Sequence, residues 1–202
     1  MIDLIVIRHG ETDWNRRNCF QGQIDVPLNA TGRSQALALA AALGSEPIDV
    51  VVSSDLSRAQ ETAAIATAAL GQDIERDPRW REQHFGLLEG QELADVQATQ
   101  PQLWAQWLRH DPDFALPGGA ESVRAFHERV VGAVQALAQA HAGRRVALFT
   151  HGGVLDMLWR TAHGLPLAGP RECAIPNTGI NRLRWDAGRL RVLQWAEATH
   201  LR

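Results

Sequence analysis

Two stretches of the sequence place a histidine and a glycine directly after an apolar run. Leu4-Ile5-Val6-Ile7 is followed by Arg8-His9-Gly10, and residues 146–150 are followed by His151-Gly152. Such continuous apolar runs are typical of strands buried on both faces of a sheet. Ligands of open α/β sheets collect beyond the carboxyl ends of the strands, so we expect His9 and His151 to meet in one crevice.

A third apolar run, residues 48–53, leads through a polar turn to Arg58 in the first turn of a predicted helix. An arginine there opposes the helix dipole unless an anion binds both. Taken alone, Arg58 would be interpreted as a surface residue paired with Asp55 or Glu61. Together with Arg8 it brings two guanidinium and two imidazole groups to one sheet edge, a set that suits phosphate.

These residues belong to an ordered set of motifs that spans residues 2 to about 195. The set comprises Arg8-His9-Gly10-Glu11-Thr12, Asn15, residues 54–59 with Thr62-Ala63, Glu82 with Phe85-Gly86, and His151-Gly152. With these motifs the chain resembles the histidine phosphatase (phosphoglycerate mutase-like) superfamily. Residues 117–122 (PGGAES) and 177–183 (NTGINRL) resemble its small bacterial phosphatase branch. That branch includes broad-specificity, α-ribazole and phosphosugar phosphatases, which the motifs do not separate.

The resemblance implies a role for each matching residue. His9 would be the nucleophile that becomes a phosphohistidine, and Glu82 would protonate the leaving oxygen and then activate water. The implied catalytic set is His9, Glu82, Arg8, Arg58 and His151. The residues implied to bind or border the phosphate are Arg8, Asn15, Gln21, Gly22, Arg58, His151 and Gly152. No metal and no cofactor is implied.

Elementary chemistry is consistent with these roles. Phosphoryl transfer depends mainly on positioning and on charge stabilisation. An imidazole attacks only when neutral, and the flanking Arg8 and Arg58 should lower the pKa of His9. A covalent intermediate would make water the second acceptor. The alternative interpretation of Glu82 is a surface salt bridge to Arg79 or Arg81.

Three functions fit this pattern, and the first is favoured. It is a metal-independent phosphomonoesterase that hydrolyses small-molecule phosphate esters. The alternatives are a phosphoglycerate mutase and a non-catalytic phosphate-ligand binding module. Mutase-like members of the superfamily carry a longer insertion after the acid glutamate, with additional basic residues. Here 36 residues separate Glu82 from Gly119, and Arg109 is the single lysine or arginine among them.

The elements that must position these residues predict one α/β domain over residues 1–202. Strand-like runs alternate with helical stretches, so we expect a mostly parallel sheet with helices on both faces. Two runs, 180–185 and 190–195, flank a turn and predict an antiparallel edge. Helices are predicted from a Thr31 cap to Leu43 and over residues 55–70, from 122 onward, and over 152–162. Residues 86–120 are interpreted as a helical excursion over the site, with Leu87, Leu88, Trp104, Trp107 and Phe114 as an apolar pocket wall.

Bulk composition excludes several classes of protein. The formal net charge is -3, from 20 basic and 23 acidic residues, so we expect neither a nucleic-acid nor an anionic-membrane partner. Two cysteines allow at most one disulfide, and no apolar run reaches the length of a membrane span. These features, with no leader visible after Met1, predict a cytoplasmic protein. The edge hairpin and the tryptophans are compatible with a homodimer.

Overall fold

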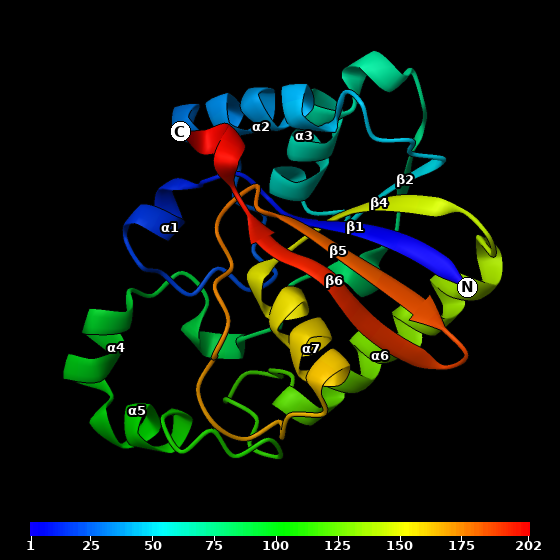
Figure 1. Ribbon diagram of the computed structural model, residues 1–202. Coiled ribbons are helices and arrows are strands. Elements are labelled where there is room, and N and C mark those ends of the chain that lie inside the picture. Colours follow the sequence, from blue (N-terminus) through cyan, green and yellow to red (C-terminus); the bar gives the residue numbers. More distant parts are fainter.

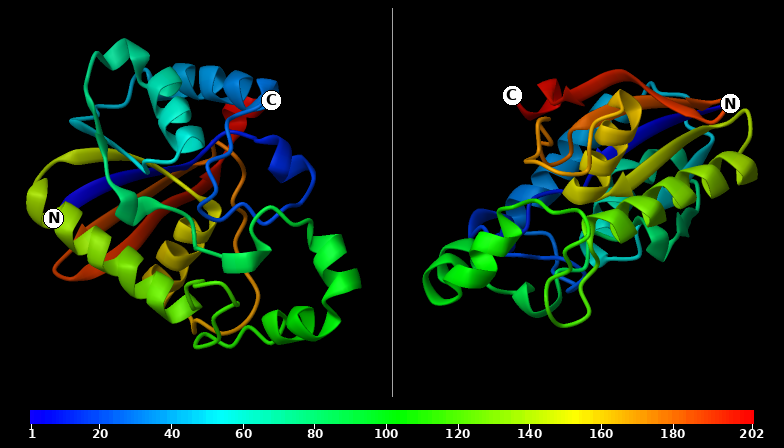
Figure 2. Two further views of the ribbon diagram at one scale, coloured as in Figure 1. Left: turned by 180° about the vertical axis from the view of Figure 1, so that it is seen from behind. Right: turned by 90° about the horizontal axis from the view of Figure 1, so that it is seen from below.

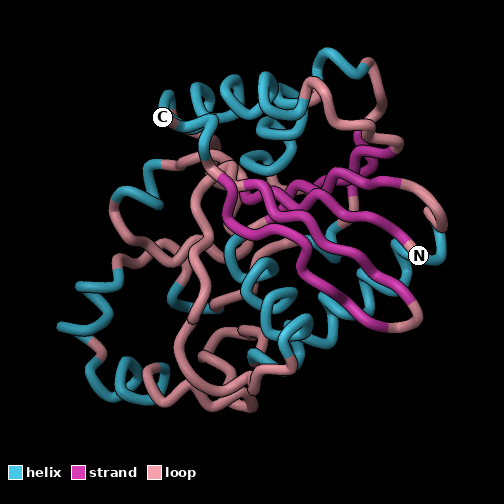
Figure 3. The backbone as a smooth tube through the Cα atoms, viewed as in Figure 1, coloured by secondary structure: helices cyan, strands magenta, loops and turns pink.

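A computed structural model describes residues 1–202, and a single six-stranded sheet forms its centre (Figures 1 and 3). The strands are β1 (Ile2–Arg8), β2 (Val50–Ser53), β3 (Ile74–Arg76), β4 (Arg145–Thr150), β5 (Ile180–Asp186) and β6 (Arg189–Glu197). Their order is β3-β2-β4-β1-β5-β6. The first four strands run parallel, and β5 is antiparallel to both β1 and β6. The predicted mostly parallel sheet with an antiparallel edge is therefore confirmed.

Helices cover both faces of this sheet. The α-helices are α1 (Asp13–Arg16), α2 (Ala30–Leu43), α3 (Ser57–Ala66), α4 (Leu93–Thr99), α5 (Pro101–Trp107), α6 (Val123–Ala140) and α7 (Gly152–His163). Short 3₁₀ turns are η1 (Ala68–Leu70), η2 (Pro78–Trp80), η3 (Gly86–Leu88) and η4 (Thr199–Leu201). The pair α2 and α3 lies on one face, and α6 and α7 lie on the other (Figures 1 and 2). No helix is both long and apolar enough to span a membrane.

The alternation of side chains along β1 explains the two layers. Leu4 and Val6 join the core cluster that contains Phe126 of α6. Ile5 and Ile7 point to the other side, into the cluster that contains Leu39 of α2. Successive strand residues face opposite sides of a sheet, so a continuous apolar run supplies two cores at once.

Three local predictions differ from the structure. The short edge strand β3 was not expected, because an exposed edge strand needs no apolar alternation. Asn29, and not Thr31, caps α2, and its side chain accepts a hydrogen bond from the backbone N–H of Gly32 at 2.8 Å. The helix expected over residues 55–70 breaks at Thr67, where α3 gives way to η1.

The excursion over residues 86–120 lies beyond the carboxyl ends of the strands (Figures 1 and 2). It contains η3, α4 and α5, followed by a segment without regular structure. It has a small core of its own, built from Phe20, Leu88, Val96 and Leu116. The excursion can therefore form one wall of a cavity without taking part in the main cores.

The loop after β1 packs directly on the first turn of α2. A Cβ atom on Gly32 would lie 2.2 Å from the carbonyl oxygen of Glu11, and one on Gly10 would lie 2.5 Å from the carbonyl oxygen of Gly32. Both clashes involve backbone, which cannot move aside as a flexible side chain can. Two glycines are thus required where the loop carrying His9 meets the helix.

We expect Gly32→Ala to lower the free energy of unfolding by about 1–3 kcal/mol, because the new methyl group overlaps the Glu11 carbonyl. The matched control is Gly132→Ala in α6, where a Cβ meets no atom within 4 Å. That change should raise the free energy by about 0.5–1 kcal/mol, since alanine is the better helix former. Urea unfolding of both variants measures the difference, and stabilisation by both would contradict the clash.

Candidate active site

His9 and His151 leave the sheet side by side. Arg8 ends β1 and Thr150 ends β4, and these two residues are register partners in the parallel ladder. The histidines that follow them have ring centroids 5.2 Å apart, with planes inclined at 56°. Both rings are buried. The expected meeting of the two His-Gly motifs is thus present in the structure.

The imidazole of His9 is fixed in one tautomer. Its Nδ1 lies 2.7 Å from the carbonyl oxygen of Gly10, which can only accept, so Nδ1 carries the proton and Nε2 keeps a free lone pair. The loop around it is also fixed, because Asn177 donates to the His9 carbonyl and the Gly10 N–H donates to Thr62. Burial lowers the pKa of His9 well below its ordinary value, and the charges of Arg58 and Arg8 lower it further. The expected direction of this shift is confirmed, although burial is the larger cause.

His151 is also neutral in this environment. Burial is again the main cause that lowers its pKa well below the ordinary value, followed by the charge of Arg58. Its Nε2 lies 2.8 Å from the hydroxyl oxygen of Ser54. Its Nδ1 is buried and has no hydrogen-bond partner in the protein. An oxygen-rich ligand would provide that missing partner.

Two arginines reach the same place from different elements. Arg8 donates from Nη1 to the carbonyl oxygen of Ile175 at 2.8 Å. Arg58, fully buried on α3, donates to the carbonyl oxygens of Ile24 at 2.9 Å and Gly22 at 2.7 Å. The Nε atom of each arginine is buried without a partner. Burial lowers the pKa of each guanidinium to about 10, so both remain charged at neutral pH.

Neither arginine has a carboxylate partner. Asp55, which could have paired with Arg58, instead binds Arg81, and Glu61 binds Arg33. Carbonyl oxygens orient a guanidinium without neutralising its charge. The site therefore holds two oriented positive charges without an ion-pair partner next to two neutral imidazoles, and, against the effect of burial, the nearby charge of Glu82 raises the pKa of both guanidinium groups.

Glu82 lies at the edge of this group on the segment that follows η2. Its Oε1 accepts from the N–H of Gln83 at 2.9 Å, and its Oε2 accepts from the N–H of Gly153 at 3.0 Å. A Cβ on residue 153 would lie 2.1 Å from Oε1, so only glycine permits this approach. Arg79 and Arg81, the alternative partners, bind Asp77 and Asp55 instead. Glu82 is thus held by backbone and not by a surface salt bridge.

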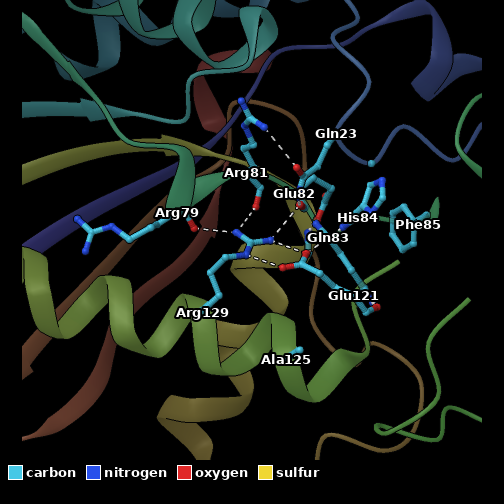
Figure 4. Close-up of polar contacts among 12 residues, drawn as sticks. Gln23, Arg79, Arg81, Glu82, Gln83, His84, Phe85, Glu121, Ala125 and Arg129 are labelled. Atoms are coloured by element: carbon cyan, nitrogen blue, oxygen red, sulfur yellow. Dashed lines mark hydrogen bonds and ion pairs between the residues drawn. The ribbon is translucent and has the colours of Figure 1, made fainter. Parts of the chain in front are cut away.

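Arg129 of α6 fixes the backbone on either side of Glu82 (Figure 4). Its Nη1 donates to the carbonyl oxygens of Arg79 at 2.8 Å and Arg81 at 3.0 Å, and its Nη2 donates to that of Glu82 at 3.1 Å. The carboxylate of Glu121 accepts from its Nε and Nη2, each at 2.7 Å. Both Nη nitrogens therefore hold the segment that carries Glu82, while Nε and Nη2 bind Glu121.

The remaining predicted site residues are Asn15, Gln21, Gly22 and Gly152. Asn15 caps α1 through Thr12 and lines a shallow depression beside Arg8. Gln21 accepts a hydrogen bond from the Thr12 hydroxyl, and Gly22 provides the carbonyl that holds Arg58. Gly152 begins α7, and a Cβ there would lie 3.6 Å from Nε of Arg8. Gly22 thus supports Arg58, Gln21 supports Thr12, and Gly152 leaves room beside Arg8.

A cavity of about 370 Å³ opens next to Glu82 and Gly153. Four elements build its walls: the excursion, α6, α7 and the segment between α7 and β5. Of the five apolar side chains expected to form a wall, Trp107 and Phe114 do so. Leu88 is buried in the separate core of the excursion, and Leu87 is exposed. The cavity is thus a partly apolar space directly beside the Glu82 carboxylate.

Sequence reasoning did not single out Arg129, Glu121, Gly153 or Arg171. A signal existed for Arg129, which follows Phe126 by three positions and so shares the core-facing stripe of α6. A charged residue on an apolar stripe indicates a polar partner in the interior. Gly153 and Arg171 carried no such signal, because only the folded chain brings them to Glu82 and to the cavity.

Comparison with known proteins identifies the family. A family model described as "Histidine phosphatase superfamily (branch 1)" matches residues 4–198, and the chain belongs to this superfamily of enzymes. Phosphoglycerate mutase-like protein 4 of Arabidopsis thaliana is 36% identical over 98% of this chain and 86% of the relative. The metal-independent phosphoserine phosphatase of the same plant is 33% identical over 98% and 83%. A solved mycobacterial glucosyl-3-phosphoglycerate phosphatase, in complex with VO3, has a TM-score of 0.86 at 33% identity over 96% and 98%.

The buried neutral histidines predict that stability falls in acid. An unfolded chain protonates His9 below the ordinary pKa of 6.5, whereas the folded state resists protonation. The contribution of His9 is therefore fully present above that pH and decreases below it, by about 1.4 kcal/mol between roughly pH 7.5 and pH 5.5. Urea unfolding of the wild type and of His9→Asn in phosphate-free buffer measures this. The variant should lose less stability over the interval, and an identical loss in both proteins would contradict the assignment.

Proposed function

We propose that the protein is a metal-independent phosphomonoesterase that acts on small-molecule phosphate esters through a phosphohistidine on His9. The observation that carries the proposal is the free lone pair of His9 Nε2 beside two guanidinium groups that have no carboxylate partner. A dianionic phosphoryl group would satisfy those charges and the unpartnered Nδ1 of His151 together. This arrangement supports phosphoryl binding with the nucleophile already in place.

In the first step, Nε2 of His9 attacks phosphorus. A nitrogen–phosphorus bond forms as the bond from phosphorus to the ester oxygen breaks, with the two groups in line. Arg8, Arg58 and His151 stabilise the charge on the three oxygens that are transferred. The carbonyl contact at Nδ1 supports the developing positive charge on the ring. The alcohol leaves toward the cavity beside Glu82.

Glu82 donates a proton to the departing oxygen, so an alcohol and not an alkoxide is released. In the resting site its carboxylate accepts two backbone N–H groups, which hold it beside the cavity. The incoming phosphate dianion favours the protonated form by like-charge repulsion. Substrate binding thus favours the protonated Glu82 that the first step requires.

In the second step, water takes the phosphoryl group from His9. Glu82, now deprotonated, accepts a proton from the water while the nitrogen–phosphorus bond breaks, and inorganic phosphate is released. The neutral imidazole is regenerated with its proton still on Nδ1. His9 and Glu82 both return to the protonation states in which they began the first step. The cycle therefore consumes only the ester and water and needs no metal.

Hydrolysis is favoured over the mutase alternative by the excursion, which contributes no lysine or arginine to the cavity wall. Arg109, the one lysine or arginine of the excursion, does not line the cavity. Two of the relatives described above are named phosphatases, whereas the plant protein at 36% identity is named mutase-like. The non-catalytic alternative has no support, because the chain is an enzyme of the superfamily. A direct assay with 3-phosphoglycerate, scored for 2-phosphoglycerate and for phosphate, decides between transfer and hydrolysis.

We expect wild-type protein to hydrolyse p-nitrophenyl phosphate in the presence of EDTA. His9→Ala should lower kcat/KM by a factor of about 1,000 or more, because no other residue can form the intermediate. His163→Ala, at the exposed end of α7, is the matched control and should retain activity. Phosphate release is the measurement. Turnover by His9→Ala, or loss of wild-type activity in EDTA, would refute the proposal.

Glu82→Gln should discriminate between leaving groups. An alkyl phosphate needs a proton on its leaving oxygen, so its kcat/KM should fall by about 100- to 10,000-fold. p-Nitrophenol leaves without that proton, so p-nitrophenyl phosphate should lose far less. The comparison uses kcat/KM, which reports the first chemical step for both esters. An equal loss on both would remove Glu82 from the role of acid.

A further inference from the structure

Arg171 is a cavity-lining arginine that has no partner. It lies on the segment between α7 and β5, shown in orange in Figure 1. Its guanidinium makes no hydrogen bond and no ion pair within the protein, although carboxylates line the same cavity. Glu121 is paired with Arg129 and Asp156 with Arg160, while the other two carboxylates of the lining, Glu82 and Asp111, form no ion pair with Arg171. Arg171 is thus the one arginine of the wall without an ion-pair partner.

The backbone that carries Arg171 is held firmly. Arg160, only 5% exposed, donates to the carbonyl oxygens of Pro166, Ala168, Gly169 and Pro170. The last of these bonds, to Pro170 at 2.7 Å, fixes the residue directly before Arg171. Arg160 therefore fixes the backbone next to Arg171. The N–H groups of Arg171 itself are left without a partner in the protein.

Arg171 faces Arg8 across Gly152. A Cβ atom on Gly152 would lie 3.6 Å from Nη1 of Arg171 and 3.6 Å from Nε of Arg8. The two like charges are close enough that Arg171 contributes to the lowered pKa of Arg8, after burial. Holding two unpaired like charges close together is unfavourable, so an anion that enters the cavity beside Arg171 lowers that cost.

The phosphoryl group alone does not account for Arg171. Arg8, Arg58 and the two histidines already surround the position of that group. Arg171 lies instead on the cavity side, on the same wall as Glu82 and Gly153, where the leaving group is released. A second anionic group on the leaving alcohol would meet it there. A guanidinium matches the planar carboxylate group with two parallel hydrogen bonds.

We propose that Arg171 binds a carboxylate on the leaving group, so that phosphorylated hydroxy acids are preferred over the phosphates of neutral alcohols. This inference rests on the proposed function, since it names the substrate class of the same site. It also changes the interpretation based on the excursion, whose lack of basic residues argued against a carboxylated substrate. The cation comes from the segment between α7 and β5 instead.

The test uses two esters that differ only in the group at issue. 3-Phosphoglycerate carries a carboxylate where glycerol 3-phosphate carries a hydroxymethyl group. Wild type should favour 3-phosphoglycerate in kcat/KM, and Arg171→Met should lower that value about tenfold, mainly through KM. Glycerol 3-phosphate should change less than about twofold. Arg171→Lys should recover part of the loss, and Arg109→Met, an exposed arginine outside the cavity, should change neither ester.

A binding measurement separates this inference from the proposed function. In the His9→Ala background, which should not turn over, calorimetry gives the Kd of each ester with and without Arg171→Met. Selective loss of 3-phosphoglycerate binding supports the carboxylate site even if hydrolysis were absent. Equal weakening of both esters would make Arg171 a phosphoryl ligand and overturn the proposal. Unchanged binding of both, or a wild-type preference for glycerol 3-phosphate, would also overturn it.

Discussion

The site depends on two guanidinium charges that are held in the interior without a carboxylate. Arg8 and Arg58 are oriented by carbonyl oxygens of Ile175, Gly22 and Ile24, which accept hydrogen bonds but leave the charge intact. A buried charge without a counterion is costly, and the cost is relieved when an anion enters. The same charges, together with burial, keep both imidazoles neutral. One electrostatic arrangement thus provides a place for an anion and keeps the lone pair of His9 Nε2 free, and the three carbonyl oxygens come from two segments, the loop with Gly22 and Ile24 and the segment with Ile175.

The site has two parts, which are built by different elements of the fold. The cluster of His9, His151 and the two buried arginines is built at the ends of β1, β2 and β4, where the ladder register places His9 beside His151. The adjacent cavity is built mainly by elements outside the sheet, which contribute Trp107, Phe114 and Arg171 to its lining. The family model spans both parts, since it matches residues 4–198. The second part is where members of such a family can differ, because it contributes contacts to the substrate without moving the reacting atoms.

Much of this site is readable in the sequence because its residues follow buried strands. His9, His151 and Arg58 each come after an apolar run, and parallel strands must end at one edge, so their convergence follows from the pattern. Arg171 is different, because its position depends on the path of a loop that Arg160 fixes through four carbonyl oxygens. No periodicity encodes such a path. Gly153 is hidden for a related reason, since its contribution is a backbone N–H and the space left by a missing side chain.

The contacts of Arg129 have a consequence for how the fold can change. Its partner Glu121 accepts from the His84 N–H through its carboxylate and donates its own N–H to the His84 carbonyl. These two hydrogen bonds join His84 to Glu121, so the two ends of the intervening chain, which includes the whole excursion, are held together. Length and sequence can vary within that chain while the segment carrying Glu82 stays fastened to α6. The excursion has one further attachment, to residues 17–23, through hydrogen bonds that join Phe20 to Gly90 and Gln91 and Asn18 to Leu93, so changes beyond Leu93 disturb the fewest of these contacts.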